Sequence, residues 1–132
     1  MMEIKVTATG PGPERLWREA LAAGRLTLPF CDACGRAHFF PRVLCPHCGA
    51  GDITFREVSG RGTVHSTTVL RRKPAEGGDL NIALVDFAEG GRMMSRVDGL
   101  PPAEVRIGLA VTARILVEDG APIVVFVPGE AA

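Results

Sequence analysis

Several features that mark particular classes of protein are scarce or missing in this chain. It has no tyrosine, one tryptophan and six phenylalanines, so aromatic residues make up 5% of its 132 residues. Fifteen basic and fifteen acidic side chains leave no formal net charge. Proteins that bind nucleic acid neutralise phosphates with a basic surplus and stack bases on aromatic rings. The composition therefore argues against a nucleic-acid partner.

Segments that would direct the chain to a membrane or out of the cell are also missing from the sequence. No apolar run approaches the about 18 residues that a membrane-spanning helix needs. No secretory hydrophobic region precedes the cysteines. We therefore expect a soluble protein in the cytoplasm, where thiols stay reduced.

A self-sufficient active site is not evident either. The three serines, Ser59, Ser66 and Ser95, do not lie in the setting of a nucleophile elbow. The segment Gly60–Gly62 has no third glycine and continues as a predicted strand, so it is not a dinucleotide-binding turn. His65, the histidine outside the cysteine region, is interpreted as a structural residue. We expect that the chain alone is not an enzyme.

The four cysteines are the most informative residues that the chain does contain. They form two pairs of the type Cys-x2-Cys with ten residues between the pairs: Cys31, Cys34, Cys45 and Cys48. Such spacing brings four thiolates around one tetrahedral ion. Because all four protein ligands are sulfur, the ion would have no open position for a substrate, and its role would be structural. Such an ion contributes on the order of 10 kcal/mol to a small module.

Other interpretations of the cysteines are weaker. Disulfides need an oxidising compartment, and a thioredoxin-like motif would use a single pair beside a βαβ unit. An iron site of the rubredoxin type has the same four ligands, so ligand type leaves iron open beside zinc. We favour Zn²⁺ because nothing else in the sequence indicates electron transfer. His38 and His47 are alternative ligands, but the four thiolates already complete the shell.

The N-terminal region predicts one short helix. The segment Met1–Gly12, which we call the lead, shows no persistent pattern and is expected to be mobile or docked on a partner. Pro13 is suited to a first helical position, and apolar residues at helical spacing predict a helix over Pro13–Ala23. Trp17 lies on its apolar face. This helix either packs on its own domain or presents Trp17 to a partner, since tryptophan is enriched at interfaces.

The remainder predicts a mainly β chain. A strand at Leu26–Phe30 leads into the cysteines, and five further strands follow them. The first of the five covers 53–58 and 62–70 and is interrupted by glycines. The other four are expected at 81–87, 92–97, 109–117 and 123–127. This pattern fits a small barrel of the OB type. We therefore expect a lead and helix over residues 1–27, a zinc ribbon over 28–52 and a five-stranded OB-fold barrel over 53–132.

Two groups of cations are candidates for contact with a ligand or partner. Arg71, Arg72 and Lys73 end a predicted strand, where they could hold phosphates of coenzyme A or an acidic surface. The alternative interpretation is that these three residues form a solvated loop whose charges aid solubility. Arg42, beside the second cysteine pair, has the same two interpretations.

The motifs together resemble a known family of small proteins that joins a rubredoxin-like zinc ribbon to an OB-fold, formerly a domain of unknown function. The resemblance covers nearly all of the chain after residue 13. The matching segments are Phe30–Gly35, Phe40–Arg42, Leu44–Gly49, Ser59–Val64, Ala83–Asp86 and Arg106–Val111.

The resemblance implies an accessory role. Family members associate with enzymes of the thiolase superfamily, including thiolases and lipid-transfer-type aldolases that act on steroid-CoA or aromatic acyl-CoA esters. It implies a non-catalytic subunit that docks on the dimer of such an enzyme to give a heterotetramer, is required for its activity and meets acyl-CoA only indirectly. The lead is shorter than in many relatives, which bears on the size of the docking surface.

Two hypotheses of other classes remain open on the sequence. A single-stranded nucleic-acid binding module is suggested by the barrel, and an electron carrier by the four sulfur ligands. The sequence does not determine which acyl-CoA is the substrate or whether the reaction is thiolysis or aldol cleavage. It also does not determine which face docks on the partner or whether the chain is part of a fusion.

Overall fold

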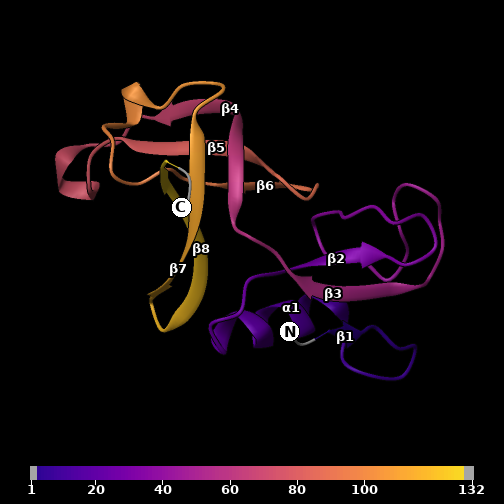
Figure 1. Ribbon diagram of the computed structural model, residues 1–132. Helices are drawn as coiled ribbons and strands as arrows, with labels where there is room; N and C mark the ends of the chain where they lie inside the picture. The colour runs from indigo at the N-terminus through magenta and orange to yellow at the C-terminus, as the bar shows by residue number, and fades with distance from the viewer. Residues whose placement is uncertain (1–2, 130–132) are drawn as a thin grey trace. The chain divides into compact units, whose positions relative to one another are not determined.

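The computed structural model describes residues 3–129, and these form two compact units (Figure 1). The first unit runs to Ser59 and also includes residues 89–91 and 117–123. The second unit comprises 60–88, 92–116 and the described residues from Val124 on. Each unit has its own sheet.

The first unit is built on a three-stranded antiparallel sheet in the order β1-β3-β2. Its strands are β1 (Ile4–Lys5), β2 (Thr27–Cys31) and β3 (Ile53–Glu57). The short strand β1 corrects the expectation of a patternless lead for its described part; Met1 and Met2 lie outside the described residues. Two residues are too few to show a periodic pattern, and their pairing partners lie about fifty positions away in β3.

The position of β3 differs from the sequence prediction. Residues 53–58 were expected to open the barrel, but Ile53–Glu57 pairs with all five residues of β2. Local β-propensity identifies a strand without indicating its partner, because pairing depends on residues distant in sequence. The proposed domain limits at 27–28 and 52–53 stay a prediction.

Helix α1 (Pro13–Ala22) begins at the predicted proline and ends one residue before the predicted end. Trp17, Ala20 and Leu21 are its buried residues. The Trp17 indole N–H donates a 3.0 Å hydrogen bond to the carbonyl of Thr27, and its ring meets that of Phe39 edge-on at 5.2 Å. The helix therefore packs its apolar face on its own unit, which is the first of the two interpretations that the sequence allowed.

The second unit contains most of a five-stranded sheet in the order β6-β5-β4-β7-β8; residues 117–123, at the hairpin of β7 and β8, are grouped with the first unit. Its strands are β4 (Arg61–Leu70), β5 (Leu80–Phe87), β6 (Arg92–Ser95), β7 (Ala110–Glu118) and β8 (Ala121–Pro128). Short 3₁₀ turns lie at Pro74–Glu76 and Pro102–Glu104. All five predicted barrel strands therefore have a counterpart, with the first starting at Arg61 instead of Ile53.

The two ends of this sheet meet and close it. Val97, just after β6, forms a parallel bridge with Phe126 of β8. The Phe126 N–H donates to the carbonyl of Arg96 at 3.0 Å, and the Asp98 N–H donates to the carbonyl of Phe126 at 2.8 Å. An order 3-2-1-4-5 with the last strand returning to the third is the closed Greek-key barrel of an OB-fold, as predicted.

The strands of the barrel contribute the buried side chains of its core. Val64, Val85, Val111, Val125 and Phe126 are each no more than 2% exposed. In β5, burial alternates strictly along Leu80–Phe87, as expected for a strand with one face inside. The buried residues of the barrel include the rings of Phe87 and Phe126 beside aliphatic side chains. No described helix of the chain is long and apolar enough to cross a membrane.

Candidate metal centre and its surroundings

The two cysteine pairs lie in two loops with the same backbone hydrogen bonds. In the first loop, the Cys31 N–H donates to the Arg36 carbonyl and the Gly35 N–H to the Cys31 carbonyl, at 3.0 and 2.7 Å. In the second, the Cys45 N–H donates to the Ala50 carbonyl and the Gly49 N–H to the Cys45 carbonyl, at 2.8 and 2.9 Å. We call these loops, 31–36 and 45–50, the first and second knuckle.

A glycine follows the second cysteine of each knuckle for a conformational reason. Gly35 has φ of 78° and Gly49 has φ of 81°. In this region a β-carbon collides with the backbone, so glycine is strongly preferred. The glycine of the motif Cys-x2-Cys-Gly therefore allows the tight turn that closes each knuckle.

The four sulfur atoms meet at one point. All lie within 4.8 Å of one another. The Sγ atoms of Cys31 and Cys48 are 3.5 Å apart, and those of Cys34 and Cys45 are 3.7 Å apart. A tetrahedron with Zn–S bonds of about 2.3 Å has edges of about 3.8 Å. The donor set and its spacing therefore fit one tetrahedral ion held by thiolates.

The thiols influence one another's ionisation strongly. Burial raises the pKa of Cys45, but backbone N–H groups of Cys48 and His47 stabilise its thiolate and lower the pKa to about 7. The backbone N–H of Ala50 lowers the pKa of Cys48, yet the neighbouring thiols raise it to about 12. Without a cation, four thiolates this close repel one another. A divalent ion removes that conflict, and its binding releases protons.

The two histidines of this region lie outside the cluster of four sulfurs, in keeping with the sequence analysis. The ring Nε2 of His47 lies 3.3 Å from the Ala37 carbonyl oxygen. His38 is 3% exposed, and neither of its ring nitrogens has a hydrogen-bond partner. Burial, followed by the positive potential of His47 and Arg42, lowers the pKa of His38. It is a buried neutral histidine, which its position between two cysteine pairs did not indicate.

An ion-pair network joins the first knuckle to the N-terminal strand. Asp32 accepts hydrogen bonds from Lys5 Nζ at 2.9 Å, Thr54 Oγ1 at 2.6 Å and Arg56 at 2.6 Å. The hydrogen bond from Thr54, followed by that from Lys5, lowers the pKa of the Asp32 carboxyl. Lys5 also reaches Asp52 at 3.4 Å. The network fixes the lead against the metal loops, and sequence reasoning missed it because its members are far apart in the chain.

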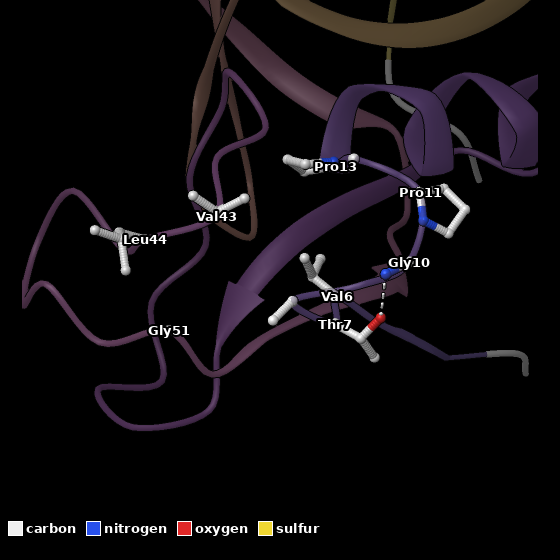
Figure 2. Close-up of a pocket in the computed structure, with 10 residues that line it drawn as sticks. Val6, Thr7, Gly10, Pro11, Pro13, Val43, Leu44 and Gly51 are labelled. Atoms are coloured by element: carbon white, nitrogen blue, oxygen red, sulfur yellow. Dashed lines mark hydrogen bonds between the residues drawn. The ribbon is translucent and has the colours of Figure 1, made fainter.

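A groove of about 350 Å³ lies between the lead and the residues that flank the second knuckle (Figure 2). The lead and the start of helix α1 contribute residues between Val6 and Pro13, and the facing wall is formed by Val43, Leu44 and Gly51. None of the residues that line it is charged. No sequence pattern indicated this groove, because the lead has no recognisable periodicity.

The predicted contact residues lie in different places. In the first unit, Trp17 is 8% exposed, so little of its ring is available to a partner, whereas Arg42 is exposed. In the second unit, Arg71 pairs with Asp79 at 2.6 Å, and Arg72 Nε donates to the Gly78 carbonyl at 2.8 Å.

The third member of the predicted cationic cluster, Lys73, precedes a short 3₁₀ turn and is exposed. Its backbone N–H donates to the Glu76 carboxylate at 3.2 Å. The cluster is therefore partly committed to interactions within its own loop. Its role in binding coenzyme A or a partner stays a prediction.

His65 lies on the exposed side of the barrel. Its Nδ1 is 3.2 Å from a guanidinium nitrogen of Arg92 and 3.5 Å from Asp86, and Arg92 pairs with Asp86 at 2.6 Å. A register shift in the β4–β5 pairing occurs at this residue, between Val64 and Ser66. This arrangement is a surface charge network, which agrees with the structural interpretation of His65.

Family models match two consecutive parts of the chain. Residues 18–54 match the ChsH2 rubredoxin-like zinc ribbon domain, and residues 55–116 match the ChsH2 C-terminal OB-fold domain. Among solved structures, the chain resembles "Ltp2-ChsH2(DUF35) aldolase" with a TM-score of 0.77 and 30% identity, covering 92% of this chain and 98% of that one.

Two curated relatives carry further names. A "DUF35 domain-containing scaffold protein" of Methanothermobacter thermautotrophicus is 32% identical over 98 residues, which are 71% of this chain and 74% of that protein. A "Probable enoyl-CoA hydratase alpha subunit" of Thermomonospora curvata is 33% identical over 124 residues, or 89% of this chain. The chain spans only 39% of the length of that protein. From its zinc-ribbon motif, its closed barrel and these matches, the chain belongs to the ChsH2-type DUF35 family of zinc-ribbon and OB-fold proteins.

Proposed function

We propose that this chain is a non-catalytic accessory subunit that docks on an acyl-CoA enzyme of the thiolase superfamily and is required for its activity. The observation that carries the proposal is its likeness to the DUF35 chain of an aldolase complex, at 30% identity over 98% of that chain. The name of the Thermomonospora relative, a hydratase alpha subunit, also associates such a module with acyl-CoA chemistry.

The proposed role of the metal is structural. Cys31, Cys34, Cys45 and Cys48 would hold one Zn²⁺, and four protein sulfurs leave no position at which a substrate could bind the ion. When bound, the ion supplies charge neutralisation for the thiolates and a cross-link between the two knuckles. The chain's own contribution is therefore to hold a surface in shape. We propose that the substrate, an acyl-CoA ester, is bound and cleaved by the partner.

The distribution of aromatic residues supports a protein partner over a nucleic acid. In the second unit the aromatic residues are Phe87 and Phe126, which are 3% and 0% exposed. Base stacking on an OB-fold needs exposed aromatic rings. The described barrel surface therefore offers no such platform.

The proposal is tested by co-expressing the full chain with the thiolase-like and hydratase-like subunits of its source organism. We expect a stable complex with one of them, and turnover of an acyl-CoA ester that falls at least about tenfold when this chain is omitted. An enzyme that turns over equally well without this chain would refute the requirement for activity. Binding of a labelled oligonucleotide that weakens steeply with salt would instead favour the nucleic-acid alternative.

A further inference from the structure

Three of the eight large exposed apolar side chains of the described residues lie in one loop. Phe40, Val43 and Leu44 are 48%, 57% and 57% exposed, and they fall within five residues of one another. The other large exposed apolar residues are spread over four separate segments: Leu70, Met94, Ile107 and Leu116–Val117. A contiguous exposed apolar patch on a small protein usually marks an interaction site.

Two residues of this loop, 40–44, also line the groove in Figure 2, which shows Val43 and Leu44 on one side and Val6 and Pro11 of the lead on the other. At about 350 Å³ the groove lies at the small end of the range for binding pockets, about 300–1,000 Å³. It has room for a few apolar side chains. A stable protein interface buries about 800 Å² on each partner, so the groove would be the anchor point of a larger contact.

The lead wall of the groove is held in place by interactions within the first unit. The lead wall is fixed by the Val6 N–H, which donates to the Ile53 carbonyl at 2.9 Å, and by the Lys5–Asp32 ion pair at 2.9 Å. Beyond it, the Gly10 N–H donates to Thr7 Oγ1 at 3.1 Å (Figure 2). A preformed site loses little conformational entropy on binding, which favours affinity.

The charges near the groove indicate the chemistry of its occupant. Lys5 is already shared between Asp32 and Asp52, whereas the exposed Arg42, adjacent to Val43, forms no ion pair among the described residues. An occupant with apolar side chains and a nearby carboxylate would complement this surface. A two-fold contact between two copies would place the same cationic, apolar surface against itself. The charge pattern therefore favours a different protein.

We propose that the groove and the loop 40–44 anchor an apolar segment of the acyl-CoA enzyme subunit, with a carboxylate of that segment paired to Arg42. This inference rests on the proposed function and assigns its docking surface to the first unit. Truncation or charge reversal of a central anchor commonly has a large effect on binding, and rim contacts a small one.

The test measures binding of the purified enzyme subunit, the one that forms the complex with the wild-type chain, to single variants of the full chain. We expect Leu44→Asp and Pro11→Asp, on opposite walls, each to raise the Kd by about 100-fold. Arg42→Glu should raise it about tenfold and remove part of its salt dependence, whereas Arg42→Lys should retain binding. Zinc content and Trp17 fluorescence must match the wild type, which shows that the first unit is intact.

The matched control is Met94→Asp on the barrel, where the side chain is 71% exposed. The inference predicts wild-type affinity for this variant. If Met94→Asp abolishes binding while the groove variants bind normally, the docking surface lies elsewhere, and the inference fails although the proposed function stands. If the groove variants change only the self-association of the chain, measured by light scattering, the groove joins two copies and the inference also fails. If no enzyme subunit binds the wild-type chain, the proposed function itself fails.

Discussion

In the first unit the residues from Asp32 to Asp52 are almost entirely loop, whereas in the second unit most residues belong to paired strands. The sheet of the first unit has a core of its own, in which Leu28, Ile53 and Phe55 are at most 1% exposed. Its knuckles do not share that protection, because Cys34 and Cys48 are exposed. The barrel buries its core behind a closed set of strands.

The comparison indicates that the two units depend on different interactions. Backbone hydrogen bonds and side-chain packing are sufficient to account for the barrel. The knuckles have two pairs of short backbone hydrogen bonds and the four sulfurs, so an ion is the interaction that would hold them together. The sheet and helix of the first unit should depend on the ion less than the knuckles do and more than the barrel does.

Metal removal should have the largest effect on stability, and it should affect the first unit without affecting the second. A strong zinc chelator should cost the first unit on the order of 10 kcal/mol of binding free energy. Hydrogen exchange followed by mass spectrometry should then show fast exchange over residues 31–52, with protection in β4–β8 unchanged. Trp17 is the one tryptophan and reports on the first unit alone. Equal loss of protection in both units would contradict the comparison.

Truncation of one core phenylalanine in each unit is the next largest change. Phe55 and Phe126 are 1% and 0% exposed, and Phe→Ala in a core costs about 3–5 kcal/mol. We expect Phe55→Ala to lower the midpoint of the Trp17 fluorescence transition in urea. Phe126→Ala should instead lower the urea concentration at which the barrel strands lose their protection from hydrogen exchange. A shift of both probes by both variants would mean that the units unfold together.

A close backbone approach in the barrel predicts an intermediate effect. A β-carbon on Gly62 would lie 2.8 Å from the Asp86 carbonyl oxygen and 2.8 Å from Val85 Cγ1. Gly62→Ala should therefore force β4 and β5 apart and cost about 1–3 kcal/mol, measured as the free energy of unfolding in urea. In the first unit, Gly51→Ala is the control, because its β-carbon would meet only atoms at 3.8 Å or more. Equal stability of the two variants would contradict this account.

The smallest predicted effect concerns the buried His38. Its pKa is lowered in the folded chain, chiefly by burial, so the unfolded chain binds the proton more readily. The stability of the first unit should therefore fall as the pH decreases through about 6.5. His38→Leu should be near neutral at pH 7.5 and should flatten this decline in thermal melts between pH 7.5 and 5.5. An unchanged slope in His38→Leu would contradict this account.

The sequence predicts the parts of the fold that have a local signature. The Cys-x2-Cys-Gly motifs indicate the knuckles, Pro13 marks the helix start, and the alternation of Ala110–Glu118 identifies a strand. The partner of β3 has no local signature, since a β-branched run pairs equally well with a ribbon or a barrel strand. The groove also escaped prediction, because it forms only when β1 pairs with β3 and brings the lead to residues 43–44.

The candidate site divides in the same way. The cluster of four sulfurs follows from spacing alone, whereas the burial of Trp17 depends on a hydrogen bond to Thr27 and a ring contact with Phe39. Residue type made Trp17 a candidate for partner contact, and tertiary packing gave its apolar face a place inside the first unit. Exposure of Val43 and Leu44 likewise depends on how the knuckles fold.

Native mass spectrometry of the full chain, purified without added metal and with its thiols probed by alkylation, tests the central claim most directly. The account predicts one Zn²⁺ per chain and four cysteines that resist alkylation until the ion is removed. A folded chain with no bound ion and four reactive thiols, or one carrying two disulfides, would contradict it.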